Sequence, residues 1–274
     1  MPPVKVLRPQ PDPDAVNRRI TNGTELVLML DYDGTLAPFQ ADRHLAYPSP
    51  WVLPVLKSWM NAPAVHVAIV SGRPADEVAA LLRFDPLPDI WGAHGWEVRR
   101  SSGQLDRRKP PALARAGLDL AMKVASDAGF SPQIERKAAS VAIHWRGLSS
   151  GEIVRIRHWT AAAWGEIAHN HELLLHPFDG GLELKAGETN KGTAVSQIIS
   201  ESPPNTFAIY AGDDLTDEDA FAVLPDNALG IQVGPATRPT AAHWRLESPE
   251  ELQGLLESWL SLRLGTGKIS RVTE

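Results

Sequence analysis

The sequence predicts an α/β protein in which a parallel-sheet core is interrupted by a smaller α+β unit. In the outer parts of the chain, apolar runs of strand length alternate with helical patterns, which indicates parallel strands covered by helices on both faces. Composition changes at residues 107–111, where basic residues adjoin prolines. We therefore expect a flexible N-terminal arm at residues 1–23, a core domain at 24–108 and 186–274, and an inserted domain at 109–185.

The first core strand ends in two carboxylates. Residues 26–30 are all apolar, and Gly34 ends the run after Asp31 and Asp33. Because side chains alternate along a strand, both aspartates should point to the same side. Two like charges at the end of a buried strand persist only if they share a cation or a proton. A pair of solvated turn aspartates is the alternative, since Asp-Gly is a common turn dipeptide.

The next elements repeat a strand, helix and strand order. A proline-bearing loop leads to a helical pattern at 51–60, and 64–70 is a second buried strand that runs into Ser71-Gly72-Arg73. Proline suits a first helical turn because its missing N–H has no partner there, so 74–83 should be helical. Residues 90–98 indicate a strand, a loop and another strand.

The inserted segment has a different pattern. Half-apolar alternation is typical of a small open sheet with helices on one face. An Asp-Gly-Gly sequence between apolar runs indicates a hairpin. The elements predicted there are helices at 112–128 and 150–168, an alternating segment at 133–146, and hairpin strands at 173–177 and 182–185 around Asp179-Gly180-Gly181.

The core pattern returns after residue 187. A capping box at Ser248–Glu251, with proline at the first helical position, opens the last helix. The elements predicted in this part are helices at 193–200, 217–224 and 249–262 and buried strands at 207–211 and 229–233.

Composition excludes several classes of function. The net charge of −6, without a long basic run, argues against nucleic acid or an anionic membrane as partner. The chain has no cysteine, which excludes disulfides, thiolate metal sites and cysteine nucleophiles. It has neither a segment of transmembrane length nor the layout of a secretory signal. We expect a cytoplasmic monomer.

Polar residues suited to one reaction follow several core strands. The first strand supplies Asp31 and Asp33, the second runs into Ser71, and 207–211 runs into an acidic segment that begins at Asp213. Ligands of open α/β sheets bind beyond the carboxyl ends of the strands. Acids gathered there repel one another unless a divalent cation lies among them, and an all-oxygen set favours Mg²⁺. With Lys191 nearby, the set suits phosphoryl transfer.

These motifs resemble the four motifs of the haloacid dehalogenase (HAD) phosphatases. They are DYDGT at 31–35, SGR at 71–73, Lys191-Gly192, and GDDLTDED at 212–219. In finer detail the chain is similar to trehalose-6-phosphate phosphatases, in which DYDGTLAP, SGR, G-x-HG, ERK…S…H-x-R and GDD-x-TDED occur in this order. The resemblance covers residues 26–233 and implies a HAD-like Rossmannoid core with an inserted α+β cap.

The resemblance implies a role for each core residue. Asp31 would be the nucleophile that forms an aspartyl-phosphate, and Asp33 the general acid and base. Ser71 would hold a phosphoryl oxygen, and Lys191 would pair with the phosphoryl group and the nucleophile. Mg²⁺ would be bound by Asp31, the main-chain carbonyl of Asp33 and Asp213. Asp214 and Asp217 would support the metal site.

The resemblance also implies which residues contact the substrate. The candidates are Arg73, His94, Glu135, Lys137, His144 and Glu183. Acids and bases on an open sheet are often only its solvated face. A helix-start arginine and a loop histidine are often structural, so this second reading stays open for each candidate.

The implied activity is Mg²⁺-dependent hydrolysis of trehalose 6-phosphate, a small-molecule sugar phosphate that a synthase would supply. Only about 40 residues separate Asp31 from Ser71, too few for an inserted domain there. The insertion therefore lies after Ser71, which disfavours a sugar mutase. Ala93, and LKAGETNKG after Glu183, depart from the family pattern.

These departures leave a related substrate open. Sucrose phosphate, mannosylglycerate phosphate or a pseudo-trehalose phosphate would use the same core chemistry. A phospho-accepting signalling domain is the non-enzymatic alternative, although it needs no cap. A substrate-sensing pseudoenzyme would lack a catalytic position, and none is missing here.

Overall fold

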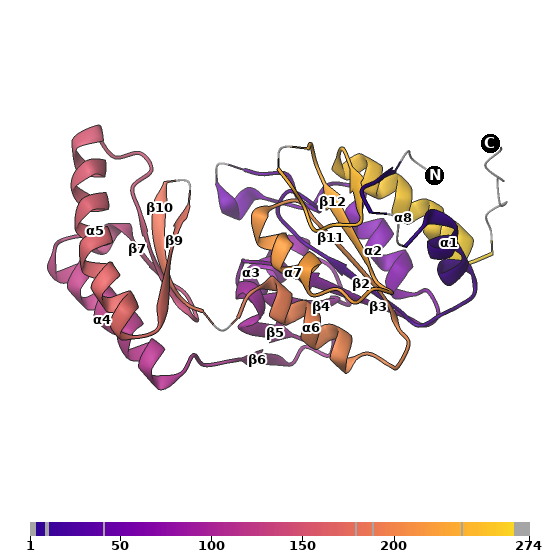
Figure 1. Ribbon diagram of the computed structural model, residues 1–274, viewed down its shortest axis with the longest axis horizontal. Helices are drawn as coiled ribbons and strands as arrows, with labels where there is room; N and C mark the ends of the chain where they lie inside the picture. The colour runs from indigo at the N-terminus through magenta and orange to yellow at the C-terminus, as the bar shows by residue number, and fades with distance from the viewer. Residues whose placement is uncertain are drawn as a thin grey trace. The chain divides into compact units, whose positions relative to one another are not determined.

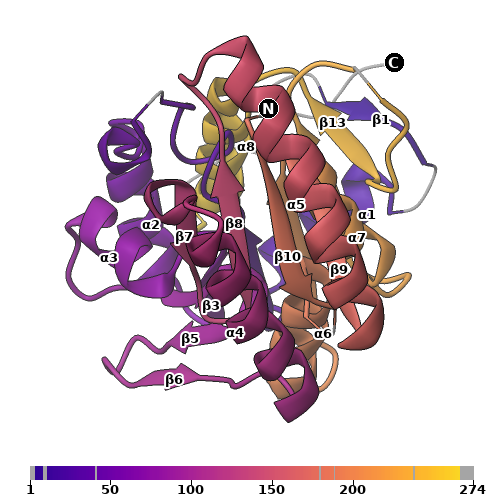
Figure 2. The same ribbon diagram turned by 90° about the vertical axis from the view of Figure 1, so that its left-hand side faces the viewer.

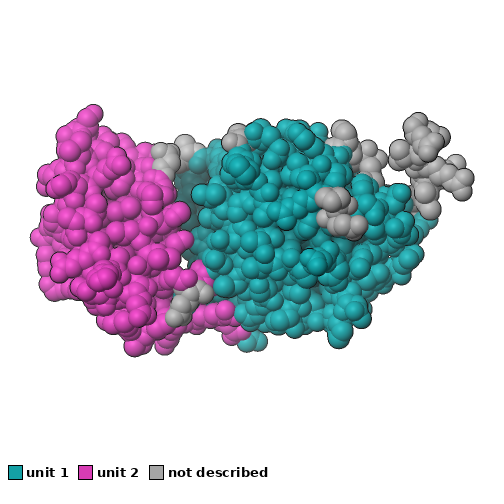
Figure 3. All heavy atoms as spheres, viewed as in Figure 1, with its two compact units in different colours: residues 1–105, 190–274 teal, residues 106–189 magenta. Residues whose placement is uncertain are grey.

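The computed structural model describes residues 4–8, 11–40, 42–178, 180–187, 189–236 and 238–265. The chain forms two compact units, residues 1–105 with 190–274 and residues 106–189 (Figure 3). The inserted segment predicted at 109–185 lies inside the second unit. None of the helices in the described part of the chain combines the length and apolarity needed to cross a bilayer.

The larger sheet is mostly parallel, which confirms the predicted α/β class. Within the described residues its strand order is β1-β13-β12-β11-β2-β3-β4-β5-β6. All pairs from β13 through β12, β11, β2 and β3 to β4 are parallel. On one side β1 pairs antiparallel with β13, and on the other β5 pairs antiparallel with β4. The strands are β1 (Lys5–Val6), β2 (Leu26–Leu30), β3 (Val65–Val70), β4 (Asp89–Gly92), β5 (Glu97–Arg99), β6 (Leu105–Arg107), β11 (Phe207–Gly212), β12 (Leu229–Val233) and β13 (Trp244–Leu246).

Alternate residues of the central strand β2 serve two different cores. Leu26, Leu28 and Leu30 join one cluster, whereas Val27 and Met29 join the other. Helices α1, α2, α3 and α8 pack on the first face, and α6 and α7 on the second, as Figure 2 shows for α2 and α6. The helices are α1 (Pro13–Thr21), α2 (Val52–Met60), α3 (Ala75–Leu82), α6 (Lys191–Glu201), α7 (Glu218–Ala222) and α8 (Pro249–Arg263).

The second unit is an open α+β layer. Its antiparallel sheet has the order β7-β8-β10-β9, and both of its long helices lie on one side of the sheet (Figure 1). Asp179, predicted in the hairpin turn, lies outside the described residues. The elements are α4 (Ala112–Asp127), β7 (Ile134–Arg136), β8 (Ser140–His144), α5 (Ser150–Asn170), β9 (Leu173–Phe178) and β10 (Gly181–Ala186).

Several short elements differ from the prediction. Helix α1 buries Val16 and Ile20 completely, so this part of the predicted flexible arm packs on the core. The helix predicted at 217–224 is present as the shorter α7 (Glu218–Ala222). A 3-10 turn, η4 (Leu215–Asp217), which the sequence does not predict, precedes it, and the side chains of Asp214 and Asp217 form a capping box there. The other 3-10 turns are η1 (Arg43–Leu45), η2 (Ala93–Gly95) and η3 (Ser131–Gln133).

A buried arginine ties both ends of the first unit together. The Arg263 side chain, at the end of α8, donates five hydrogen bonds to the carbonyl oxygens of Ile20, Thr24, Pro63 and Ala64. These carbonyls belong to the segments that precede β2 and β3. The arginine therefore fixes the two strands whose opposite ends carry Asp31 and Ser71.

Candidate active site

The sheet order brings the predicted core residues to one edge. Strand β2 lies between β11 and β3, and the parallel register aligns their carboxyl ends. Asp31 therefore emerges between Asp213, which follows β11, and Ser71, which follows β3. Asp31 and Ser71 are 3% and 1% exposed. A polar group so deeply buried must find a partner or accept a ligand.

Lys191 supplies the positive charge of this edge. It is the first residue of α6, whose start is fixed by a capping box between Asn190 and Thr193. Its Nζ donates to Asp31 Oδ1 at 2.7 Å and to Asp217 Oδ1 at 2.8 Å. Burial alone would lower the lysine pKa, but the two carboxylates outweigh it and raise the pKa above its ordinary value. Lys191 is therefore a permanent cation shared by two acids.

Three carboxylates crowd around this single ammonium. Asp31, Asp213 and Asp217 each have an oxygen within 4.8 Å of the others. Burial, reinforced by Asp217, raises the pKa of Asp31 well above its ordinary range despite Lys191. Burial and Asp217 likewise raise the pKa of Asp213 to about 7. With all three carboxylates ionised, the cluster would carry more negative charge than Lys191 balances, and the raised pKa values show that this state is disfavoured without a further cation.

The residues present fit a hard divalent cation. Oδ1 of Asp213 is buried and has no hydrogen-bond partner among the described residues. Asp217, in contrast, accepts from Lys191, from the Tyr210 hydroxyl and from the main-chain N–H of Asp214. The donor set consists only of oxygen atoms, which suits Mg²⁺. Asp31 and Asp213 have the capacity to bind the ion directly.

Gly34 allows the acids to approach so closely. It adopts φ +80°, and a Cβ atom there would lie 2.1 Å from Asp213 Oδ2. Any side chain would collide with the carboxylate and strain the backbone. The glycine of the DYDGT motif is therefore required by the acidic cluster.

Asp33 is held by Arg73 through two hydrogen bonds. Nε and Nη2 of Arg73 donate to the two Asp33 oxygens at 2.6 and 2.7 Å. Nη1 donates to the main-chain oxygen of Arg43 at 2.7 Å and to Glu77, and Arg43 donates to Glu77 in turn. The structure thus gives Arg73, predicted to contact substrate, a set of protein partners. This network positions the Asp33 carboxylate.

Ser71 and His94 lie next to each other. The His94 N–H donates to the Ser71 carbonyl oxygen at 2.9 Å, and a Cβ on Gly72 would lie 2.8 Å from the His94 ring. The serine Oγ accepts from the main-chain N–H of Arg73 at 3.1 Å. Ala93 and His94 both have positive φ, of 49° and 57°. The sharp turn therefore places the imidazole against the SGR motif.

The predicted sugar-contacting residues form two pairs within the second unit. Lys137 Nζ donates to Glu183 Oε1 at 3.1 Å, and His144 Nε2 lies 2.9 Å from Glu135 Oε2. The register places Glu135, His144 and Glu183 on the same face of the small sheet, because Glu135 and Glu183 are both opposite Ala142. The opposite face carries Val141 and Ile143, which are fully buried. The four residues therefore belong to the polar face.

Sequence reasoning missed several partners of these residues. Ser140 Oγ donates to Glu183 Oε1 at 2.6 Å, and strand alternation from His144 could have identified it. The Tyr210 hydroxyl donates to Asp217; a tyrosine in a buried apolar strand needs such a partner. Arg238 Nη2 donates to the Asp213 main-chain oxygen at 2.8 Å, and no local pattern indicates this contact.

The raised pKa of Asp213 predicts how pH changes stability in the absence of Mg²⁺. Folded Asp213 keeps its proton up to about pH 7, whereas an unfolded aspartate loses it near 3.8. The folded state binds more protons between these values, so stability falls as pH rises through this window. Because asparagine cannot ionise, Asp213→Asn should gain stability relative to the unmodified chain from pH 4 to 7, with no further gain above.

Urea unfolding with a chelator, at steps of pH, measures this difference. Mg²⁺ should then stabilise the unmodified chain but not Asp213→Asn. A stability difference that does not change with pH would contradict the raised pKa.

Comparison with known proteins agrees with this geometry. The trehalose-phosphatase family model matches residues 29–250. A probable trehalose-phosphate phosphatase of Oryza sativa is 28% identical, over 90% of this chain and 72% of the relative. A bifunctional trehalose-6-phosphate synthase/phosphatase of Thermoproteus tenax is 29% identical, over 84% of this chain but only 31% of the relative.

A solved structure shows the same fold. The trehalose-6-phosphate phosphatase of Aspergillus fumigatus is 25% identical, with a TM-score of 0.66, and the match covers 93% of this chain and 99% of that one. The expected HAD-like fold is confirmed. The chain therefore belongs to the trehalose-phosphatase family of phosphoric monoester hydrolases.

Proposed function

We propose that this protein is a Mg²⁺-dependent phosphatase that hydrolyses trehalose 6-phosphate to trehalose and phosphate. The observation that carries the proposal is the buried cluster in which Lys191 bridges Asp31 and Asp217 beside Asp213. The choice of sugar is supported by family membership and by the names of the relatives.

The chain's own residues would perform the reaction in two steps. Asp31 attacks phosphorus and forms an aspartyl-phosphate while the bond from phosphorus to the sugar oxygen breaks. Asp33 gives a proton to that oxygen and then takes one from the water that attacks the intermediate. Ser71 and Lys191 hold the phosphoryl oxygens. The bidentate contact with Arg73 fixes the position of the Asp33 carboxyl group.

The hydrogen bonds support a division of labour among the acids. Asp213, with an unpartnered Oδ1, would bind Mg²⁺ together with Asp31 and the main-chain carbonyl of Asp33. Asp217 already accepts three hydrogen bonds and would support the site, as would Asp214, whose N–H it accepts. Bound Mg²⁺ supplies charge neutralisation around the phosphoryl group.

We place sugar recognition on the polar face of the second unit. The pairs Lys137–Glu183 and Glu135–His144 each combine a donor with an acceptor, as hydrogen bonding to sugar hydroxyls requires. His94 would act beside the core motifs. We also propose that a sugar-phosphate synthase supplies the substrate, because the Thermoproteus tenax relative combines both activities by name. The cytoplasmic location and the monomeric state stay predictions.

Phosphate release from a panel of sugar phosphates tests this function. Trehalose 6-phosphate should give the highest kcat/KM, ahead of sucrose phosphate and mannosylglycerate phosphate. Asp31→Asn should lower kcat by at least about a hundredfold, because it removes the nucleophile. A higher kcat/KM for another sugar phosphate of the panel would show that trehalose 6-phosphate is not the preferred substrate. Near-normal turnover by Asp31→Asn would refute the aspartyl-phosphate route.

Glu183→Gln tests the assignment of the polar face. A hydrogen bond to a charged group contributes about 1.5–3 kcal/mol, so KM for trehalose 6-phosphate should rise roughly tenfold or more. Hydrolysis of p-nitrophenyl phosphate, which has no sugar, should stay within about twofold. Glu166→Gln, on the exposed surface of α5, is the matched control. Equal losses with both substrates would show that Glu183 does not recognise the sugar.

A further inference from the structure

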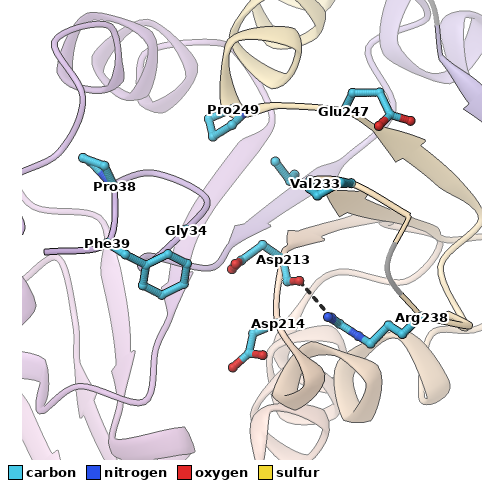
Figure 4. A pocket seen from close by; sticks show the side chains of 11 residues that line it. Gly34, Pro38, Phe39, Asp213, Asp214, Val233, Arg238, Glu247 and Pro249 are labelled. Carbon is cyan, nitrogen blue, oxygen red and sulfur yellow. Dashed lines mark hydrogen bonds between the residues drawn. The ribbon is translucent and has the colours of Figure 1, made fainter. Parts of the chain in front are cut away.

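A cavity adjoins the acidic cluster on the side of β12 and β13. Its volume is about 510 Å³, and all of its lining residues belong to the first unit. Figure 4 shows Asp213, Asp214 and Arg238 on its wall, with the guanidinium of Arg238 directed toward Asp213. Arg238 comes from the loop between β12 and β13, which the reaction proposed above does not use.

Arg238 contacts the main chain of Asp213 rather than its carboxylate. Its Nη2 donates to the Asp213 carbonyl oxygen at 2.8 Å. Its Nε lies 3.9 Å from Glu218 Oε1, and the other Glu218 oxygen accepts from the Ala241 N–H at 2.7 Å. Glu218 follows Asp217 directly, so two hydrogen bonds connect the acidic segment to the loop, and the longer contact between Arg238 and Glu218 brings opposite charges together without a hydrogen bond.

Among the described residues, the carboxylate of Asp213 has fewer hydrogen-bond donors than the carboxylates of Asp31 and Asp217. Side-chain and main-chain donors fix Asp217, and Lys191 fixes Asp31. In the described part of the chain, no donor reaches Oδ1 of Asp213. The contact with Asp31 aside, the position of this carboxylate therefore depends on its backbone, which Arg238 holds.

We propose that Arg238, backed by Glu218, is a positioning residue that sets the affinity of the acidic cluster for its divalent cation. The inference rests on the proposed function. Two effects of Arg238 oppose each other: the hydrogen bond orients a ligand, whereas the positive charge repels a cation. Orientation prevails because the guanidinium donates to a neutral carbonyl oxygen, and the Glu218 carboxylate, 3.9 Å from its Nε, offsets its charge. Partners that orient metal ligands typically contribute about 10–100-fold in affinity.

Direct Mn²⁺ binding, measured by electron paramagnetic resonance of the free ion, tests the proposal. Arg238→Gln should weaken Mn²⁺ binding about tenfold. The Mg²⁺ concentration needed for half-maximal activity should rise by the same factor, whereas kcat at saturating Mg²⁺ should stay within about twofold of that of the unmodified protein. Arg238→Lys, which keeps the charge and one donor, should show a smaller loss. Glu218→Gln should weaken binding in the same direction.

Arg99→Gln is the matched control, because Arg99 and Arg238 are both 26% exposed and Arg99 pairs with Asp76 outside the acidic cluster. Melting in a chelator verifies that each variant folds. Tighter or unchanged Mn²⁺ binding by Arg238→Gln would overturn the proposal. Absence of Mn²⁺ binding by the unmodified protein would instead refute the proposed metal dependence.

Discussion

The crowding of three buried carboxylates around one lysine is the constraint on which the rest of the site depends. Lys191 balances part of the charge of Asp31, Asp213 and Asp217, and burial, reinforced by Asp217, raises the pKa of both Asp31 and Asp213. A sheet edge that gathers acids in this way is costly in an empty protein. It becomes favourable when a divalent cation and a phosphoryl group share the edge. The same crowding thus accounts for the cost of the site and for its fit to a cation.

The topology of the larger sheet enforces this crowding. Because β2 lies between β11 and β3, residues distant in the sequence reach one edge without long loops. Gly34 then lets the first acidic motif approach the last one. At the opposite ends of β2 and β3, Arg263 fixes the preceding segments through their carbonyl oxygens. A substitution at Arg263, far from the acids, can therefore change the positions of the acids by shifting β2 or β3.

The sequence could predict the core motifs because their signal is local. Asp31 directly follows an apolar run that is typical of a buried strand, and Lys191 precedes a helical pattern. The partners of these residues have no such signal. Tyr210 lies inside an apolar strand, and its contact with Asp217 depends on the turn η4, which the sequence does not predict.

Other elements were missed for related physical reasons. Strand β13 has only three residues, too few for a pattern, and its place in the sheet is fixed by pairing with β12. Arg238 donates to a main-chain oxygen, which every residue has, so the sequence gives no indication of which residue it contacts. The polar face of the second unit could be predicted from alternation, but the pairing of Lys137 with Glu183 depends on how separate strands align.

The most direct test of the central claim is anomalous diffraction from crystals soaked in Mn²⁺. The account predicts a single strong peak between the carboxylates of Asp31 and Asp213. Lys191 Nζ should still donate to Oδ1 of Asp31. A structure at saturating Mn²⁺ with no peak between these two carboxylates would contradict it.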